Sequence, residues 1–156
     1  MAKPESWRLA IENYPFQVAV GTRYQDLDVM GHINNVAMAA MFETGRIHFH
    51  HTIGRHPKDK GVRWLVASVN LAYVHEAHFP EEMLIASGIG HIGTTSWHVY
   101  SAAFQDGECV AVCDTVMVAH GTEGRRIIDD EVRETMQVHF AKPGRGADQL
   151  KSKKSS

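Results

Sequence analysis

Residues 36–42, VAMAAMF, constrain the fold of this chain more than any other segment. They begin a predicted helix over residues 36–51, about 24 Å long at roughly 1.5 Å per residue, and they are apolar on every side of it. A helix that is apolar all round is buried, so we expect a sheet that wraps around it. Glu43 and Arg46, three residues apart, can form an ion pair where this helix emerges.

Five strand-like segments surround this helix in the sequence, one before it and four after it. They cover residues 16–23, 64–74, 83–91, 96–104 and 108–119. The dipeptide Asp106-Gly107 suits a tight hairpin between the last two, and a final helix is expected to begin near Asp129. This order predicts an α+β fold in which one antiparallel sheet wraps around a long central helix.

The length and charge of the chain limit its organisation and its partners. Its 156 residues suit a single domain, expected over residues 1–141, and the polar, basic residues 142–156 are expected to be disordered. The formal net charge of −2 creates no field that would attract nucleic acid or an anionic membrane. Because the N-terminal residues lack the apolar stretch of a secretory signal, and no run is long enough to span a membrane, we expect a cytoplasmic location.

The strand predicted over residues 108–119 is apolar on both faces, so both should be covered. Strict alternation would place Cys109 and Cys113 on the same face, about 13 Å apart at roughly 3.3 Å per residue. That separation is too long for a disulfide, so two reduced, buried thiols are expected. Asp114 falls on the opposite face, where we expect it at a strand end or in an interface salt bridge; a supporting role at a functional site is the alternative.

The polar loop at residues 26–35, DLDVMGHINN, leads directly into the central helix. One interpretation is purely structural: Asp26 or Asp28 braces a turn, Gly31 permits it, and Asn34 or Asn35 caps the helix. Taken alone, the segment fits this interpretation as well as a catalytic one.

The same loop also holds the groups that hydrolysis of an activated acyl group requires. Such a reaction needs a base for water or a carboxylate nucleophile, together with hydrogen-bond donors for the developing oxyanion. Asp28 is the candidate carboxylate, and the N–H groups around residues 34–37 open a helix whose dipole favours negative charge. His32 lies between them in the loop, where it can orient water or a substrate.

Three segments resemble the hotdog-fold acyl thioesterases, both the 4-hydroxybenzoyl-CoA thioesterase-like branch and the plant acyl-ACP thioesterases. They are the stretch DLDVMGHINNV, the helix ending in FETGR and the IGTTS turn at residues 92–96. The resemblance covers roughly residues 16–121. It implies the hotdog fold and the hydrolysis of an acyl-CoA or acyl-ACP thioester to free acid and thiol. It also implies a homodimer or homotetramer with the site at the subunit interface, and no metal or cofactor besides the CoA or phosphopantetheine of the substrate.

The resemblance assigns roles residue by residue. Asp28 matches the carboxylate of the bacterial enzymes and would act as general base or nucleophile, and His32 matches the histidine of the acyl-ACP enzymes. The implied substrate-binding residues are Asn34, Asn35, Thr95 and Ser96. Thr95 and Ser96, or the strand that holds Asn70, would reach the ligand from the partner chain.

The chain departs from the family pattern in three places. Glu81-Glu82, after Pro80, affects only the entry to a strand, and the other two departures concern the site. Met30 stands where the plant enzymes carry an asparagine proposed to act in catalysis, so their full mechanism does not transfer. Met38 stands where many relatives have a tyrosine in the helix, which predicts a more apolar pocket. The acyl group, and the choice between CoA and a carrier protein, stay open.

Two alternatives from other functional classes compete with the hydrolase interpretation. A hotdog hydratase or dehydratase would also use a carboxylate and a histidine, in a loop of different spacing. A non-catalytic acyl-CoA-binding module would bind without turnover. Histidines 48, 50, 51 and 56 suggest metal ligands, but residues two apart on a helix point to different sides and form no ready chelate.

Overall fold

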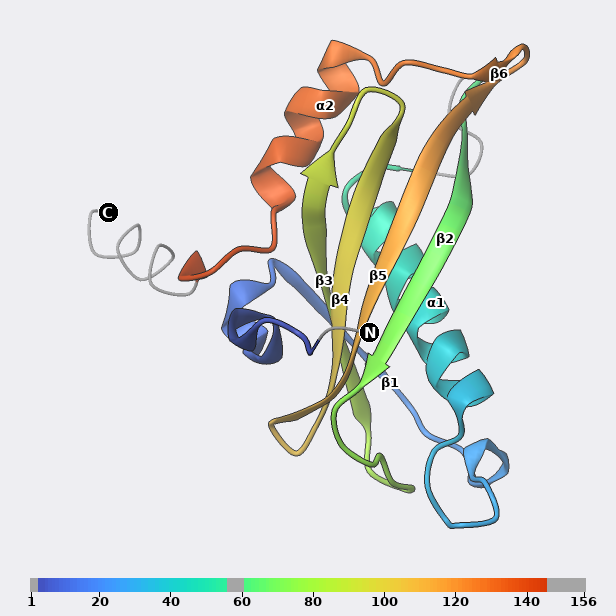
Figure 1. The fold of residues 1–156 in the computed structure, drawn as a ribbon, viewed down its shortest axis with the longest axis vertical. Helices are drawn as coiled ribbons and strands as arrows, with labels where there is room; N and C mark the ends of the chain where they lie inside the picture. Colours follow the sequence, from blue (N-terminus) through green and yellow to red (C-terminus); the bar gives the residue numbers. More distant parts are fainter. Residues whose placement is uncertain (1–2, 56–60, 146–156) are drawn as a thin grey trace.

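The predicted α+β hotdog arrangement is confirmed: an antiparallel sheet curls around a long helix (Figure 1). The computed structural model describes residues 3–55 and 61–145, so most of the predicted tail at residues 142–156 lies outside the described residues. The strands are β1 (Phe16–Val20), β2 (Arg63–Tyr73), β3 (Met83–Ile92), β4 (Ser96–Gln105), β5 (Glu108–Gly121) and β6 (Gly124–Arg125). The sheet order is β1-β3-β4-β5-β2, with β6 paired to β5. Asp106 and Gly107 form the predicted hairpin, with φ values of 50° and 80°.

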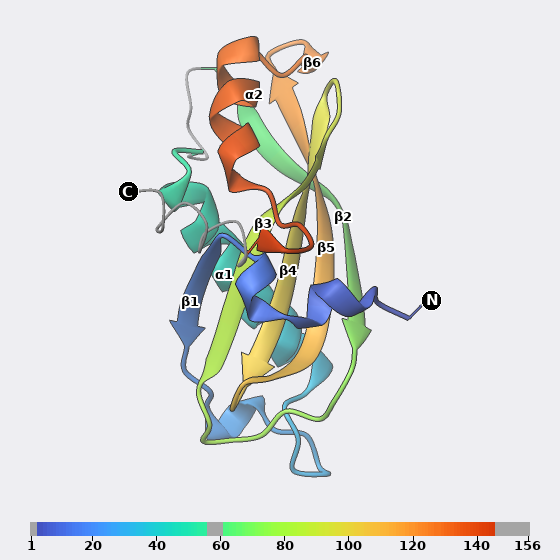
Figure 2. The same ribbon diagram turned by 90° about the vertical axis from the view of Figure 1, so that its left-hand side faces the viewer.

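The central helix, α1, begins and ends within one residue of its predicted bounds. The α-helices are α1 (Asn35–Thr52) and α2 (Asp130–Met136), and the 3-10 helices are Ser6–Leu9, Ile11–Asn13, Tyr24–Asp26 and Gln137–His139. Short 3-10 turns contain too few residues for a periodic pattern, so the sequence did not predict them. Figure 2 shows the N-terminal 3-10 helices in front of the sheet and α1 behind it. Within residues 3–55 and 61–145, neither α-helix combines the length and hydropathy that a membrane span requires.

The sheet covers one side of α1 only, so the expectation that residues 36–42 are buried all round is wrong for the single chain. The inner side of the helix holds Met38, Met41 and Phe42, each at most 5% exposed, whereas Val36 on the outer side is 80% exposed. The helix packs closely on β3 at Gly45, where any Cβ would overlap Ile85. A single open sheet has one concave face, which explains why the outer side of α1 stays uncovered.

The opposite face of the sheet is covered by the N-terminal segment, which an ion pair anchors. Arg8 donates to Asp114 at 2.6 Å and to the Tyr14 hydroxyl at 3.0 Å, and its guanidinium lies 4.1 Å from the centre of the Tyr100 ring. Because Arg8 is 6% exposed, this contact fixes the N-terminal segment on the sheet. Asp114 therefore forms its salt bridge within the chain, and not at an interface as one expectation had it.

A β-bulge places the two cysteines on opposite faces of the sheet, so the expectation of one shared face is wrong. The pairing of β4 with β5 shifts register between Ala103 and Phe104, and Val110 is the extra residue on β5. Cys109 consequently packs under the N-terminal segment, whereas Cys113 packs against the inner side of α1. Both thiols are buried and free, as expected. Bulges of this kind reverse the alternation that a sequence pattern assumes.

Two basic side chains of α1 turn inward instead of toward solvent. Arg46 is 7% exposed and forms no ion pair with Glu43, which contradicts the pairing expected from their spacing. His50, one turn further on, is 5% exposed and lies 5.0 Å from Trp97 between ring centres. Burial, together with the charge of Arg46, lowers the pKa of His50 to about 3, so its imidazole is neutral at physiological pH.

The free energy of unfolding should therefore decrease in acid because of His50. The unfolded chain binds a proton at this histidine near pH 6.5, whereas the folded protein does so only near pH 3. The free energy of unfolding should decrease as pH falls from 6.5 toward 3, by at most about 1.4 kcal/mol per pH unit from this group. Urea unfolding at pH 7 and pH 5 measures the effect. His50→Gln should weaken the pH dependence of the unfolding free energy. His48→Gln, an exposed control on the same helix, should leave this pH dependence unchanged. If His50→Gln and the wild type showed equal slopes, the prediction would be contradicted.

Candidate active site

The first half of the loop between β1 and α1 is braced by a buried carboxylate. Asp26 is 3% exposed and pairs with the Arg23 guanidinium at 2.8 Å, and it also accepts the Arg23 backbone N–H. These hydrogen bonds from Arg23 lower the pKa of Asp26. Asp26 is thus committed to the 3-10 turn that precedes the candidate site, as the structural interpretation expected.

The second half of the loop is a tight turn closed by Asp28. Its Oδ1 accepts the backbone N–H groups of Met30 at 2.9 Å and His32 at 3.1 Å, and Gly31 takes a φ of 82° between them. Asp28 is exposed, and its other oxygen, Oδ2, takes part in no hydrogen bond found among the described residues. One oxygen therefore holds the turn while the other is open to the pocket.

The start of α1 combines a cap with two unpaired donors. Asn34 caps the helix, its side chain accepting the Ala37 N–H at 2.8 Å, and its own N–H donates to the Asp26 carbonyl at 2.8 Å. The N–H groups of Asn35 and Val36 have no hydrogen-bond acceptor in the described part of the chain. Since the first N–H groups of a helix carry its positive dipole end, these two are ready donors for a negative oxygen. The sequence predicted available N–H donors over residues 34–37. In the structure the two in the middle, those of Asn35 and Val36, are the ones without an acceptor.

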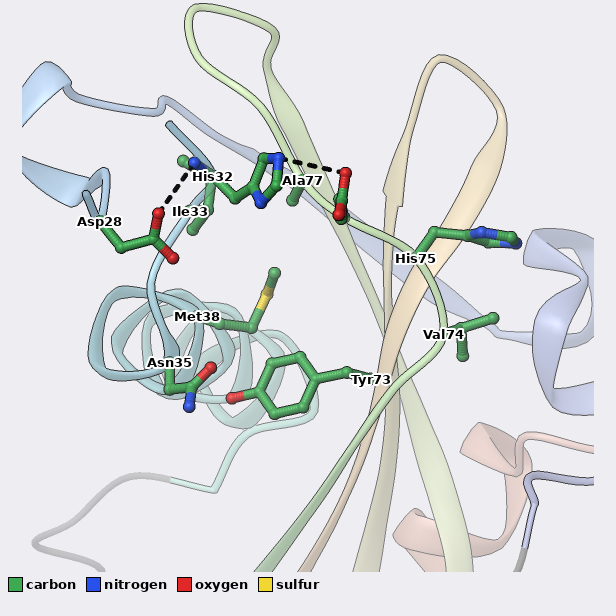
Figure 3. Close-up of a pocket in the computed structure, with 10 residues that line it drawn as sticks. Asp28, His32, Ile33, Asn35, Met38, Tyr73, Val74, His75 and Ala77 are labelled. Carbon is green, nitrogen blue, oxygen red and sulfur yellow. Dashed lines mark hydrogen bonds and ion pairs between the residues drawn. The ribbon is translucent and has the colours of Figure 1, made fainter. Parts of the chain in front are cut away.

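A pocket of about 530 Å³ lies between this loop, the helix start and the end of β2 (Figure 3). Its lining residues are Asp28, His32, Ile33, Asn35, Met38 and 73–77. A second hollow on the other side of the helix start shares Asp28 and Asn35 with it and includes Val36. Three of the four residues predicted from the loop, Asp28, His32 and Asn35, thus line one pocket. The fourth, Asn34, caps the helix and lines the adjoining hollow.

His32 has an acidic partner that the sequence analysis missed. Its Nε2 lies 3.1 Å from Oε2 of Glu76, a contact drawn as a dashed line in Figure 3. Its ring also meets that of His78 edge-on, with centres 5.4 Å apart. The His32 side chain is 29% exposed, so it is held between the loop and the β2–β3 connection with one side open to the pocket. The run HEAH at residues 75–78, which directly follows a long strand, was the signal in the sequence for this second polar segment.

Tyr73 is the other residue that the sequence analysis missed. It ends β2, extends toward Asn35 in Figure 3, and is 48% exposed. Burial of its ring raises the pKa of Tyr73, so the hydroxyl keeps its proton and can donate a hydrogen bond. A tyrosine from β2 therefore lines the pocket together with Asn35 and Met38 of α1.

Thr95 and Ser96 lie far from this pocket in the same chain. They occupy the β3–β4 turn, whereas the pocket lies near the other end of β4, where Gln105 binds the backbone of His78. The ten residues of β4 separate the two ends by about 30 Å. Asn70 also lies elsewhere, beside Arg8 and Asp114 on the outer face. A role for these residues in one site stays a prediction that requires a second subunit.

A metal ion finds no cluster of ligands within residues 3–55 and 61–145. Among the described residues, no three histidine, cysteine, aspartate or glutamate side chains are placed to hold one. His48 is exposed and His50 is buried on another side of α1, and His56 lies outside the described residues. The expected absence of a metal stays a prediction for the whole chain.

The cap assignment leads to a stability prediction. Asn34→Ala should lower the free energy of unfolding by about 1 kcal/mol, because the Ala37 N–H loses its acceptor. Asn35→Ala is the matched control, since its exposed side chain forms no hydrogen bond among the described residues. Urea unfolding of both variants measures the difference, and an equal loss in the two would refute the cap.

Comparisons with known proteins agree with this geometry. Residues 22–141 match the model of the thioesterase-like superfamily. The chain is 26% identical to YsmA of Bacillus subtilis (strain 168) over 135 residues, which cover 85% of this chain and 90% of that protein. A predicted thioesterase from Bacillus stearothermophilus has a TM-score of 0.74 at 27% identity, covering 83% of this chain and 98% of that one.

A thioesterase from Thermus thermophilus, solved in complex with coenzyme A and zinc, also shares the fold. Its TM-score is 0.74 at 23% identity, covering 85% of this chain and 99% of that one. The family match includes the polar loop, the central helix and the strands that form the pocket. This chain therefore belongs to the thioesterase-like superfamily.

Proposed function

We propose that this protein is a cytoplasmic thioester hydrolase that converts an acyl-CoA or acyl-ACP to the free acid and the thiol. One observation carries the proposal: the open oxygen of Asp28 and the unpaired helix-start N–H groups lie around the same pair of adjoining hollows. A carboxylate on one side and oxyanion donors on the other are the two requirements of acyl hydrolysis.

The general-base route accounts for every proton. Asp28 Oδ2 takes a proton from a water molecule as its oxygen attacks the thioester carbonyl carbon. The carbonyl oxygen becomes an oxyanion and accepts hydrogen bonds from the N–H groups of Asn35 and Val36. The tetrahedral intermediate then breaks its C–S bond, and the proton on Asp28 passes to the departing thiolate. As a nucleophile, the same oxygen would form a mixed anhydride that water then hydrolyses.

His32 has a supporting role in this proposal. The 3.1 Å contact of its Nε2 with Glu76 fixes the orientation of the imidazole, and its backbone N–H helps hold the Asp28 carboxylate. We infer that the free edge of the ring orients the attacking water or the thioester. Asn34 acts indirectly, because its cap sets the direction of the two donors that follow it.

The substrate carrier is inferred from chemistry and likeness. A thioester on a pantetheine arm needs no further cofactor, since water and one carboxylate complete the reaction. The Thermus thermophilus relative was solved with coenzyme A, which supports CoA as the carrier. The near-neutral charge of this chain provides no general attraction for an acidic carrier protein.

We also propose that the protein is a homodimer, or a tetramer built from such dimers. β2 is an eleven-residue strand at the sheet edge, and its apolar side chains are unusually exposed: Leu65 39%, Val66 46%, Val69 50% and Tyr73 48%. A long, apolar edge strand with unpaired backbone groups favours pairing with a second copy. Antiparallel pairing of two β2 strands would bring the β3–β4 turn of one subunit, with Thr95 and Ser96, toward the pocket of the other.

The catalytic assignment is tested with Asp28→Asn. Asparagine keeps an Oδ1 acceptor for the two turn N–H groups and removes only the charge, so the loop should persist. Thiol release from a panel of acyl-CoAs should fall by about 10²–10⁴, the usual contribution of a general base, with little change in unfolding free energy. Asp28→Ala should lose both turnover and loop stability. Unchanged turnover in Asp28→Asn would remove Asp28 from the mechanism.

The same panel separates the alternatives. A hydratase would remove the conjugated absorbance of crotonyl-CoA without releasing thiol. A non-catalytic module would bind acyl-CoA and release nothing, even at high enzyme concentration. Thiol release from the acyl-CoAs, without hydration of crotonyl-CoA, supports the hydrolase.

The dimer proposal is tested by mass. Light scattering after size exclusion should give twice the 17.4 kDa of the chain, or four times for a tetramer. Val69→Asp places like charges near the symmetry axis of a β2–β2 pair and should shift the protein to the monomer mass. Val138→Asp, at an exposed valine away from β2, is the control. A monomeric wild type would rule out the proposed interface.

A further inference from the structure

Four buried nitrogen atoms lie along the inner side of the structure with no acceptor among the described residues. They are Arg46 Nε, His50 Nε2, Trp64 Nε1 and Trp97 Nε1, and we call these residues the donor cluster. The Trp97 ring lies 5.0 Å from the His50 ring and 6.0 Å from the Trp64 ring between centres. Arg46 is one helical turn from His50. Native proteins rarely leave one such atom unpaired, so four together indicate that an acceptor is missing.

Within the donor cluster, the Arg46 guanidinium is the group whose burial without a partner costs the most free energy. Arg46 is 7% exposed, and within residues 3–55 and 61–145 it makes no hydrogen bond and pairs with no carboxylate. Glu43, the acidic residue that affects it most, points to solvent. A buried cation is stable only when an anion or several acceptors approach it. Of its three side-chain nitrogens only Nε is fully enclosed, so an anionic group can reach the two terminal nitrogens.

Part of the donor cluster lies on the same side of α1 as a residue that lines the catalytic pocket. Met38, Phe42 and Arg46 follow one another at four-residue intervals on α1, and Met38 lines the pocket beside Asp28. Arg46 is about 16 Å from Asn35 along the helix axis, and its side chain leans back over the preceding turn, leaving roughly 11 Å to the guanidinium. An extended acyl chain of medium length spans such a distance.

The sheet provides an apolar floor beside this side of α1. Cys113 lies close enough to Arg46 to affect it electrostatically, and it pairs with Leu71 of β2. Paired residues point to the same face of a sheet, so Leu71 and its neighbour Val69 face the side that carries α1. Val69 is 50% exposed. An acyl chain leaving the pocket past Met38 can therefore cover apolar side chains before it reaches Arg46.

We propose that the acyl group of the substrate carries a carboxylate at its far end, and that Arg46, with His50 and Trp97 beside it, binds this carboxylate. The proposal rests on the thioesterase function proposed above and names its substrate class, the monothioesters of dicarboxylic acids. Arginine and indole nitrogens only donate hydrogen bonds, and the neutral imidazole can donate one. A carboxylate only accepts, and its two oxygens match the planar fork of a guanidinium.

The test compares two series of non-hydrolysable thioether analogues of acyl-CoA. In one series the chain ends in a methyl group, and in the other it ends in a carboxylate. Binding to the full-length protein is measured by titration calorimetry at several chain lengths. At the matching length the wild type should bind the carboxylated analogue about 10- to 100-fold more tightly, the range for hydrogen bonds to charged groups. Arg46→Met, which keeps much of the length of the side chain without its charge, should reverse the preference.

Two further variants make the outcome decisive. Arg126→Met removes an arginine that pairs with Asp129 on the surface, and it should keep the wild-type preference. Arg46→Lys keeps the positive charge but lacks the planar fork, so it should retain part of the preference for the carboxylated analogue. This variant tests Arg46 even if Arg46→Met fails to fold. A wild type that binds both series equally, or prefers the methyl series, overturns the proposal. A preference that survives in Arg46→Met overturns the role of Arg46.

Binding and hydrolysis are read separately. If the carboxylated analogue binds as expected but its thioester is not hydrolysed, the site stands and the thioesterase function fails. If thioesters are hydrolysed without preference for a carboxylate, the function stands and this site fails. Loss of the oligomer in Arg46→Met, with no ligand preference in the wild type, would assign Arg46 to the subunit interface and overturn the proposal.

Discussion

The structure depends on how the start of α1 satisfies its backbone. Four N–H groups at any helix start need acceptors, and here Asn34 provides one with its side chain while its own N–H is held by the Asp26 carbonyl. Among the described residues, two donors stay unpaired beside the Asp28 carboxylate. If every N–H group at the helix start had an acceptor, none would be available to an oxyanion. If none had an acceptor, the first turn of the helix would fray. The partly satisfied start explains how one turn of helix both anchors the fold and faces a substrate.

Asp28 has the same double character. One of its oxygens closes a five-residue turn and the other is open to the pocket, so the structural and catalytic interpretations of this residue are compatible. The turn places the carboxylate by backbone hydrogen bonds and not by the packing of its own side chain. Such a loop can be preorganised although Asp28 itself is exposed, because Asp26 and Arg23 hold the preceding turn in place.

The concave face of the sheet is unevenly used. β3 and β4 pack tightly under α1, with Gly45 in contact with Ile85, but β2 stays half exposed beside the helix. Apolar area that remains uncovered next to unpaired donors such as those of Arg46 and His50 is unfavourable in a single chain. The proposed second subunit at the β2 edge and the proposed acyl chain along α1 would together account for both features.

The amino-acid sequence by itself determined the elements and the loop chemistry. The apolar run at residues 36–42 predicted the central helix, alternation predicted the strands, and the Asp106-Gly107 hairpin was found as expected. Asp28 and His32 were found because they lie four residues apart, within one turn. These features depend on local backbone preferences, which neighbouring residues decide.

Only the tertiary structure decided the contacts between distant segments. Glu76 reaches His32 because the β2–β3 connection crosses over the loop, and the bulge at Val110 separates the cysteines. Arg46 was expected to pair with Glu43 at helical spacing, yet the packing of α1 on β3 turns it inward. Spacing along a helix shows which side chains can meet. Which of them is buried depends on the surface against which the helix packs, and that surface is built from strands far away in the sequence.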